Sequence, residues 1–194
     1  SKIEHERLED YFLEIPPQTG FGALKLAESF LKVGNREKAQ QIITKSWLVH
    51  SYKRDQFKKI QKLFGQYLVD YNDERIENSL WERRTNDASQ MLHLVSPENR
   101  ELVRVRIALQ DRKAGVDQMI RALPKKFQNN AGLTFDRLIF RRKNNLFNRA
   151  EELLAKTSMG NAALGRPEQW LESRQIYSRR ALRSGEITRA YEIA

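Results

Sequence analysis

Apolar side chains along this 194-residue chain recur mainly at spacings of three and four residues. That spacing is typical of helices that bury one face, whereas strands alternate with a period of two. In residues 21–33, for example, Leu24, Ala27 and Leu31 form one stripe, with charged side chains turned away from it. We therefore predict an all-α fold.

Helix boundaries are marked by capping residues. Gly34 should end the first helix in a left-handed conformation, and Asn35 is a suitable N-cap for the next. Ser96 followed by Pro97 is a further helix start. We expect residues 160–167 to form the clearest loop. The expected helices are 21–33, 35–47, 56–71, 73–84, 88–94, 96–109, 116–123, 133–142, 147–156, 167–183 and 187 onwards.

A turn pattern recurs at four places, where a residue suited to the turn precedes a small alanine by five positions. The pairs are Gly34 and Ala39, Arg83 and Ala88, Asn145 and Ala150, and Gly185 and Ala190. The first residue accommodates the turn, and the alanine lets the second helix approach the first closely. The alanines are 49, 62 and 40 residues apart, which excludes a regular repeat of about 34 residues. We predict an irregular, tetratricopeptide-like superhelix of helical hairpins, forming one domain over residues 1–194.

Composition supports a folded chain, with 40% hydrophobic and 31% charged residues. No stretch approaches the length of an uncharged membrane span, and the first residues have no apolar signal core. The sequence starts at Ser1 and stops within a helical pattern, so we expect it to be a piece of a longer protein.

The net charge of +10 is concentrated in the second half of the chain. Residues 1–95 carry 15 basic and 14 acidic side chains, whereas residues 96–194 carry 20 and 11. Such an excess can attract nucleic acid, membrane surfaces or other polyanions, but it is also common in basic proteins with none of these partners. Cysteine is absent, which excludes disulfides, thiolate metal sites and cysteine nucleophiles.

Motifs for catalysis, metals or cofactors are missing. His5, His50 and His93 lie in separate segments without ligand-like spacing, so we expect no metal site. Residues 20–22 begin like a dinucleotide fingerprint but lack the third glycine and a preceding strand, so we expect a helix-entry loop and no cofactor. Adjacent acidic residues occur at Asp73-Glu74 and at Glu151-Glu152. Neighbouring side chains on a helix point about 100° apart, so neither pair can share a proton in a catalytic site.

Basic clusters could indicate a nucleic-acid site, particularly where exposed aromatic rings accompany them. The clusters are 58–59, 125–126, 141–143 and 179–180. The aromatic residues nearby fall mostly on apolar stripes, and we expect them to pack in the core. They are Phe135, Phe140, Trp170 and Tyr177.

The C-terminal third carries a resemblance to a known family. Residues 165–174 read Gly-Arg-Pro-Glu-Gln-Trp-Leu-Glu-Ser-Arg, followed by Arg180, Gly185 and residues 190–194, Ala-Tyr-Glu-Ile-Ala. This stretch resembles the helical region of soluble lytic murein transglycosylases. Phe135-Asp136-Arg137, Arg141-Arg142 and residues 105–109 are similar to the same region. Leu171 departs from the pattern, since a second aromatic residue is common there.

The resemblance implies the curved or ring-like superhelix that lies beneath the catalytic domain of these periplasmic enzymes. They cleave the N-acetylmuramic acid to N-acetylglucosamine linkage of peptidoglycan and leave 1,6-anhydro ends. Their catalytic glutamate belongs to a lysozyme-like domain with Glu-Ser and Gly-Leu-Met-Gln motifs, and neither motif occurs here. The resemblance thus implies no catalytic residue in this chain, with glycan strands and other cell-wall proteins as partners of the parent enzyme.

Residues that match the family pattern are interpreted as structural. They are Pro167, Glu168, Trp170, Arg174, Arg180, Gly185, Ala190 and Tyr191. We expect Trp170 to be a packing anchor, Arg174 to stack on or lie beside it, and Tyr191 to seal the last hairpin. The alternative hypothesis is a tetratricopeptide-like scaffold that binds proteins or RNA, for which irregular hairpins and a basic chain are equally natural.

Overall fold

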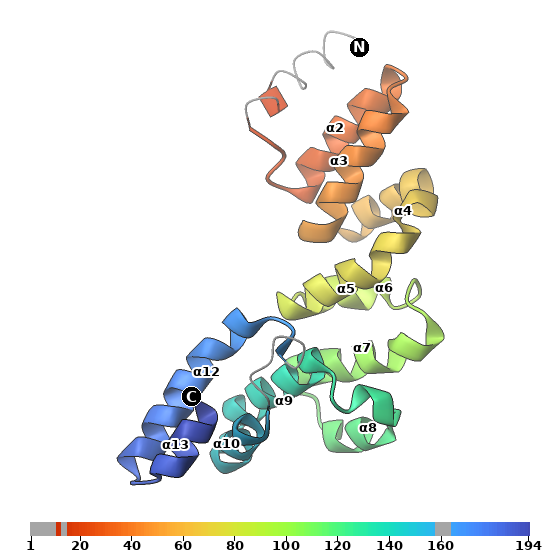
Figure 1. Ribbon diagram of the computed structural model, residues 1–194. Helices are drawn as coiled ribbons and strands as arrows, with labels where there is room; N and C mark the ends of the chain where they lie inside the picture. Colours follow the sequence, from red (N-terminus) through yellow and green to blue (C-terminus); the bar gives the residue numbers. More distant parts are fainter. Residues whose placement is uncertain (1–10, 13–14, 158–163) are drawn as a thin grey trace. The chain divides into compact units, whose positions relative to one another are not determined.

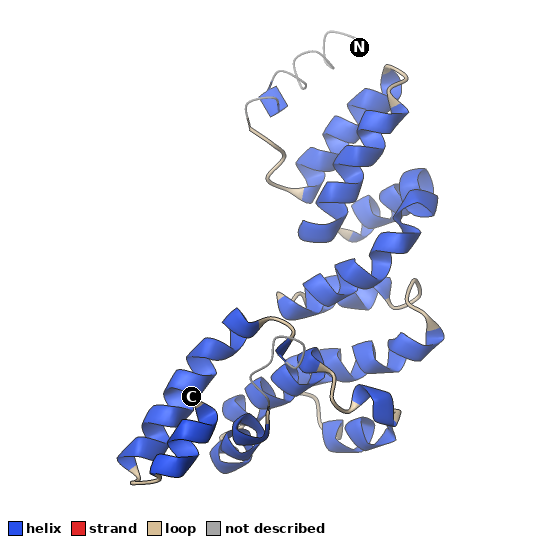
Figure 2. Cartoon of the chain, viewed as in Figure 1, coloured by secondary structure: helices blue, strands red, loops and turns tan. Residues whose placement is uncertain are grey.

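The computed structural model describes residues 11–12, 15–157 and 164–194, which form helices and turns with no strand among them (Figures 1 and 2). The predicted all-α class is confirmed. The chain divides into two compact units, residues 1–96 and 97–194. A single superhelical domain stays a prediction. In the described part of the chain, no helix has the length and apolar character needed to cross a membrane.

Unit 1 is built from amphipathic helices that pack around buried aliphatic and aromatic side chains. The elements are α2 (Gly20–Lys32), α3 (Arg36–Val49), α4 (Arg54–Leu68), the 3-10 helix η1 (Val69–Tyr71), α5 (Asn72–Trp81) and α6 (Thr85–Met91). Helix α3 contacts α2, α4 and α5, and its Ile43 and Trp47 are fully buried. The predicted N-cap is confirmed, since the Asn35 side chain accepts a hydrogen bond from the Lys38 amide at 3.2 Å.

Unit 2 has a second set of packed helices. The elements are α7 (Pro97–Gln110), α8 (Val116–Ala122), the 3-10 helix η2 (Lys125–Phe127), α9 (Ala131–Lys143), α10 (Phe147–Lys156), α12 (Pro167–Arg183) and α13 (Ile187–Ile193). Helix α9 contacts α7 and α10, and α13 contacts α10 and α12. The centre of α9 holds a buried ion pair, in which Arg106 Nε of α7 lies 2.7 Å from Asp136 Oδ2. Gln110 donates to the other carboxylate oxygen at 2.9 Å.

Four turns share one backbone geometry, in the hairpins α2–α3, α5–α6, α9–α10 and α12–α13 (Figure 1). Each has a residue with positive φ, namely Gly34 (81°), Arg83 (57°), Asn145 (59°) and Gly185 (76°). The amide of the next residue bonds to the carbonyl five positions back, as in Asn35 to Phe30 at 2.9 Å. This double turn satisfies the last carbonyls of the first helix.

The alanine of each predicted pair lies in the second helix of its hairpin and is buried. Ala39, Ala88 and Ala150 are 0% exposed, and Ala190 is 4% exposed. Its amide donates to the carbonyl of the residue that follows the turn, at 2.9 to 3.3 Å. The predicted turn pattern is therefore confirmed at all four places, including the degenerate copy at Arg83.

Several predicted boundaries need correction. Helix α4 begins at Arg54 and gives way to a 3-10 turn after Leu68. Helix α6 begins at Thr85, earlier than expected, because the turn at Arg83 already starts the next helix. Of the predicted loop, residues 160–163 lie outside the described residues, and α12 begins at Pro167 as expected.

Candidate binding groove

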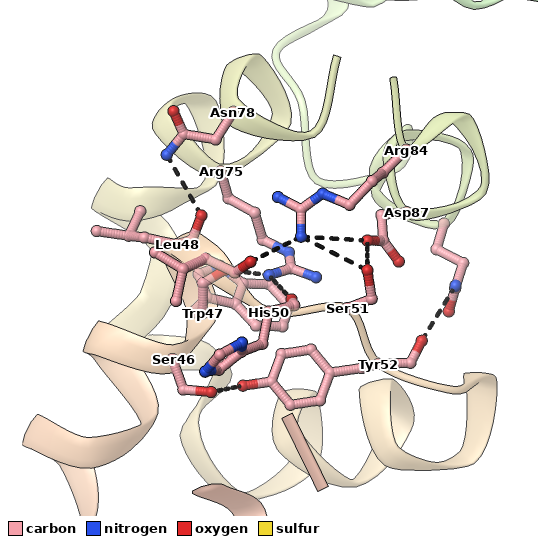
Figure 3. A network of polar contacts seen from close by, with 12 residues as sticks. Ser46, Trp47, Leu48, His50, Ser51, Tyr52, Arg75, Asn78, Arg84 and Asp87 are labelled. Carbon is pink, nitrogen blue, oxygen red and sulfur yellow. Dashed lines mark hydrogen bonds and ion pairs between the residues drawn. The ribbon is translucent and has the colours of Figure 1, made fainter. Parts of the chain in front are cut away.

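A buried guanidinium organises the end of α3 in unit 1. Arg75 of α5 is 1% exposed and donates hydrogen bonds to the carbonyls of Trp47 and of His50, the latter at 2.9 Å (Figure 3). Its guanidinium also lies 4.1 Å from the centre of the Trp47 ring. The last carbonyls of a helix have no intrahelical partner, so Arg75 satisfies groups that α3 leaves open.

The environment of Arg75 shifts its protonation equilibrium. Desolvation lowers the pKa of Arg75 to about 10, although the charges of Asp87 and Tyr52 partly oppose that effect. The guanidinium still carries its charge at neutral pH. A charge held in this way needs hydrogen bonds on its buried face, and the α3 carbonyls provide them.

The linker between α3 and α4 is held by further polar contacts from α6 (Figure 3). Ser51 Oγ donates to Asp87 Oδ2 at 2.5 Å, and Arg84 donates to the Val49 carbonyl at 2.8 Å. Gln90 Nε2 lies 3.5 Å from the Tyr52 carbonyl. Together these contacts join the end of α3 and the linker that follows it to α6 and to Arg84, the residue before α6.

Tyr52 is the aromatic member of this network. Its hydroxyl lies 2.5 Å from Ser46 Oγ, and its ring lies 5.9 Å from the Trp47 ring. Burial is the largest influence on this phenol and raises the pKa of Tyr52, with the Ser46 hydrogen bond and the Arg75 charge acting in the opposite direction. The network thus combines two cations, Arg75 and Arg84, with the Asp87 carboxylate and neutral hydroxyl groups, and it connects α3, α5 and α6.

A groove of about 810 Å³ lies beside this network, between α4 and α6. Its lining residues are polar or basic apart from one ring, and the described lining contains no carboxylate. They are Arg54, Phe57, Lys58, Gln61, Asn86, Ser89, Gln90 and His93. Arg54 and Lys58 are exposed, whereas Phe57 is buried and meets the exposed His93 ring edge-on at 6.2 Å.

Two amide atoms of the groove lining have no hydrogen-bond partner among the described residues. They are Gln61 Nε2, a donor, and Gln90 Oε1, an acceptor, and both atoms are inaccessible at the protein surface. A buried polar atom left without a partner costs about 1 to 3 kcal/mol. Because neither atom has accessible surface, a group bound in the groove would not contact them unless the glutamine side chains rotate.

A second groove, of about 410 Å³, lies between α2, α3 and the segment that precedes α2. Its walls are mainly apolar, with Leu26, Phe30 and Ile42 among them. His50 Nε2 lies 3.1 Å from the Pro17 carbonyl at its edge. Its polar lining residues are Lys38, Gln41, Lys45, Ser46 and His50.

The residues of the family pattern lie together on α12 and α13 in unit 2. Trp170 is fully buried, as expected, with its indole nitrogen 2.9 Å from the Leu164 carbonyl and its ring 5.3 Å from Phe135. Pro167 is the first residue of α12, and Glu168 is exposed in its first turn. Arg180 reaches Asn148 Oδ1 at 3.1 Å.

Two expectations in this region need revision. The Arg174 guanidinium makes no stacking contact with Trp170 in the described part of the chain; it donates to the Ile193 carbonyl at the end of α13 at 2.7 Å and to the Thr157 carbonyl at the end of α10 at 3.2 Å, because helix ends leave their last carbonyls without a partner. Tyr191 does not seal the last hairpin, since its side chain is 86% exposed. Ile193, two positions later, is the buried residue that closes it.

Aromatic residues near the basic clusters pack in the core, as predicted. Phe135, Trp170 and Tyr177 are buried and Phe140 is partly buried, so none offers an open face for a nucleic-acid base. His5 lies outside the described residues. Over the described ranges, no group of three or more histidine, aspartate or glutamate side chains could hold a metal ion.

Arg75, Gln61 and Gln90 were missed as candidate residues from the sequence. Arg75 stands among acidic neighbours in Asp73-Glu74-Arg75, where a solvent-exposed charge is the usual interpretation. Arg75 nevertheless lies next to Ile76 and four residues before Ser79, and all three belong to the buried face of α5. That position was the available clue.

No family model matches the chain, and neither a curated protein nor a solved structure matches it.

Proposed function

We propose that this chain is the non-catalytic helical scaffold of a periplasmic lytic transglycosylase that acts on peptidoglycan. The observation that carries the proposal is the similarity of residues 165–194 to the helical region of that family. The parent enzyme would cleave the linkage between N-acetylmuramic acid and N-acetylglucosamine in a separate lysozyme-like domain. This chain would position glycan strands or bind other cell-wall proteins.

The repeated turn supports a tetratricopeptide-like superhelix as the finer fold. Four hairpins use the same left-handed turn followed by a buried alanine. Within unit 2 the hairpins α9–α10 and α12–α13 pack through α10 and α13. Hairpins that bury their faces only against neighbours form extended stacks, which provide long binding surfaces.

Charge supports a polyanionic partner such as peptidoglycan. The excess of basic residues lies in residues 96–194, and the stem peptides of peptidoglycan supply carboxylates. Exposed charges of one sign raise the local concentration of an opposite partner and its association rate. RNA is the competing polyanion. Phe135, Trp170 and Tyr177 are buried, which speaks against base stacking on them, whereas Phe147 beside Arg180 is 41% exposed.

Binding to purified sacculi tests the proposal directly. The 194-residue chain should sediment with sacculi in a salt-dependent manner and release no anhydro-muropeptides. Salt-sensitive binding to single-stranded RNA, with none to sacculi, would replace the proposal by the RNA-binding scaffold. Release of anhydro-muropeptides would contradict a non-catalytic role.

Genomic sequence gives an independent test. The reading frame downstream of the codon for Ala194 should encode a Glu-Ser motif followed by Gly-Leu-Met-Gln. A frame that ends within a few dozen codons, without these motifs, would remove most of the support for the transglycosylase assignment.

A further inference from the structure

We propose that the groove between α2 and α3 binds a medium-chain fatty acid, with the aliphatic chain on its apolar walls and the carboxylate beside Lys45. The groove lies within unit 1, and its volume of about 410 Å³ falls in the usual range of ligand pockets, roughly 300 to 1,000 Å³. Residues 165–194, which carry the proposed function, belong to unit 2. Fatty-acid binding is therefore independent of that function.

The α3 wall of the groove combines accessible apolar surface with positive charge. Its lining residues are spaced three and four positions apart and therefore share one face of the helix. Val49 is 58% exposed and Ile42 is partly exposed, so a ligand can cover both side chains. Lys45 is exposed and lies three residues after Ile42 and four before Val49. The full α3 wall consists of Lys38, Gln41, Ile42, Lys45, Ser46 and Val49.

The base of the groove is apolar and comes from α2. Ala23, Leu26 and Phe30 are spaced three and four residues apart, line the groove and are at most 5% exposed. They offer a ligand no polar group to solvate. An aliphatic chain that covers Ile42 and Val49 over this base gains free energy in proportion to the apolar area that both surfaces remove from water.

The segment that precedes α2 forms a third side, and local hydrogen bonds hold it in place. His50 Nε2 lies 3.1 Å from the Pro17 carbonyl oxygen, which joins this segment to the end of α3. Thr19 Oγ1 accepts a hydrogen bond from the Gly22 amide at 3.1 Å and caps α2. Pro16 and Pro17 line the groove, and their rings restrict the backbone. A wall that is ordered in advance lowers the entropic cost of binding.

Charge selects an anionic head group with a single carboxylate. Lys38 and Lys45 belong to the lining, and no described lining residue is acidic. Glu37, the acidic residue of α3, accepts a hydrogen bond from Gln41 at 3.4 Å, eight residues before Lys45. The two lysines are two turns apart, about 10 Å along the helix axis, so one small head group meets one of them. A charge-assisted hydrogen bond from Lys45 to a carboxylate is roughly twice as strong as a neutral one.

A helical peptide fits this lining less well than a flexible chain. Helices that bind in grooves place apolar anchors about one turn apart along a continuous apolar strip. In the α3 wall, Lys45 interrupts that strip between Ile42 and Val49. An aliphatic chain can pass beside the lysine stem and end at its ammonium group.

Calorimetric titration of the 194-residue chain with sodium decanoate, below its micelle concentration, tests the proposal. We expect saturable one-to-one binding that weakens with added salt, because Lys45 is exposed. Decanol has the same chain without the charge and should bind about threefold to tenfold more weakly. Butyrate has the same head group and should bind much more weakly than decanoate, because it covers little apolar area.

Two groove variants separate the head group from the chain. Lys45→Gln should weaken decanoate binding about threefold to tenfold and leave decanol binding unchanged. Ile42→Trp should fill the groove and abolish binding of both. Lys62→Gln on α4 and Val33→Trp after α2 make the same changes at exposed positions outside the groove lining, and each should alter decanoate affinity less than twofold. Circular dichroism should show unchanged helix content in all four variants.

Several results would overturn the fatty-acid assignment. They are no saturable decanoate binding by the wild-type chain, equal affinities for groove and control variants, or decanol binding as tight as decanoate binding. An acidic amphipathic helical peptide that binds the wild-type chain, fails to bind Ile42→Trp and is not displaced by decanoate would assign the groove to a protein partner. A wild-type dimer that Ile42→Trp dissociates would assign it to a second copy of the chain.

Discussion

Gly132 of α9 lies directly against the guanidinium of Arg106 on α7, which occupies the space that a Cβ on residue 132 would need. Arg106 is fully buried and forms an ion pair with Asp136, one turn further along α9, at 2.7 Å. The missing side chain therefore lets a charged group enter the interface between two helices. Unit 2 depends on this close approach for the pairing of its buried charges.

Replacing Gly132 with alanine should displace the Arg106 guanidinium and separate it from Asp136. We expect the free energy of unfolding to fall by about 3 to 5 kcal/mol, the usual effect of breaking a buried pair. Urea unfolding followed by circular dichroism would measure it. Gly65→Ala in α4 is the control and should change stability by about 1 kcal/mol or less, because its nearest neighbour is the movable end of Gln61. Equal effects of the two substitutions would contradict the steric account.

Arg75→Met should destabilise unit 1 by about 2 to 4 kcal/mol, because it leaves the carbonyls of Trp47 and His50 without their donor. Thermal unfolding of the variant would show the loss. Arg36→Met, at an exposed position in the first turn of α3, should change stability by about 0.5 kcal/mol or less. A similar, small effect for both would mean that the buried guanidinium does not stabilise the end of α3.

Trp170→Ala should cost about 3 to 5 kcal/mol, as expected for an aromatic side chain removed from a packed core. The same α12 offers Leu171→Ala as a control at a position that is 58% exposed. Chemical denaturation would compare the two variants. A negligible effect of Trp170→Ala would contradict its role as the packing anchor of α12.

The shared turn predicts opposite effects for glycine and asparagine positions. Gly34→Ala and Gly185→Ala should each destabilise the chain by about 1 kcal/mol, since both residues have positive φ and no described atom lies within 4 Å of an added Cβ. The cost is thus one of backbone conformation. Asn145→Gly should stabilise by about 0.5 kcal/mol or leave stability unchanged. Destabilisation by Asn145→Gly as large as that of Gly34→Ala would argue against a common turn.

Two buried phenols predict a loss of stability at high pH. Burial raises the pKa of Tyr52 and of Tyr177 in the folded chain, so each folded phenol keeps its proton above the pH at which its unfolded counterpart ionises. Their contribution is fully present below pH of about 10 and is lost as pH rises through the folded pKa values. Phenolate absorbance should show a late phase that shrinks in Tyr52→Phe and again in Tyr177→Phe. An unchanged late phase in both variants would refute the assignment.

Local sequence patterns predicted the helices because a helix with one buried face needs apolar residues three or four positions apart. The hairpin turns were predictable for the same kind of reason, since Gly34 and Gly185 meet a backbone requirement and Ala39 and Ala190 meet a packing requirement within a few residues. Even Arg83, a poor turn residue by type, was identified by its distance from Ala88. These features depend on neighbours along the chain.

The contacts of charged and polar side chains were not predictable in this way. Arg174 was expected to stack on or lie beside Trp170, and its guanidinium bonds to the Ile193 carbonyl. Tyr191 was expected to seal the last hairpin but is exposed. In a seven-residue helix, small rotations decide which side chain is buried. Helical periodicity alone does not specify the rotation, because it depends on how α13 packs against α10 and α12.

The sequence alone determined the all-α class and the repeated hairpin turn. It also showed that the chain lacks the catalytic motifs of the family that its C-terminal third resembles. Only the tertiary structure brought Arg75 to the end of α3 and placed Gln61 of α4 and Gln90 of α6 on one groove. These residues lie about 25 to 30 positions apart in the sequence and come together because four helices, α3 to α6, fold into one unit. Short-range spacing encodes each helix, whereas the groove between them exists only after their apolar faces are buried against one another.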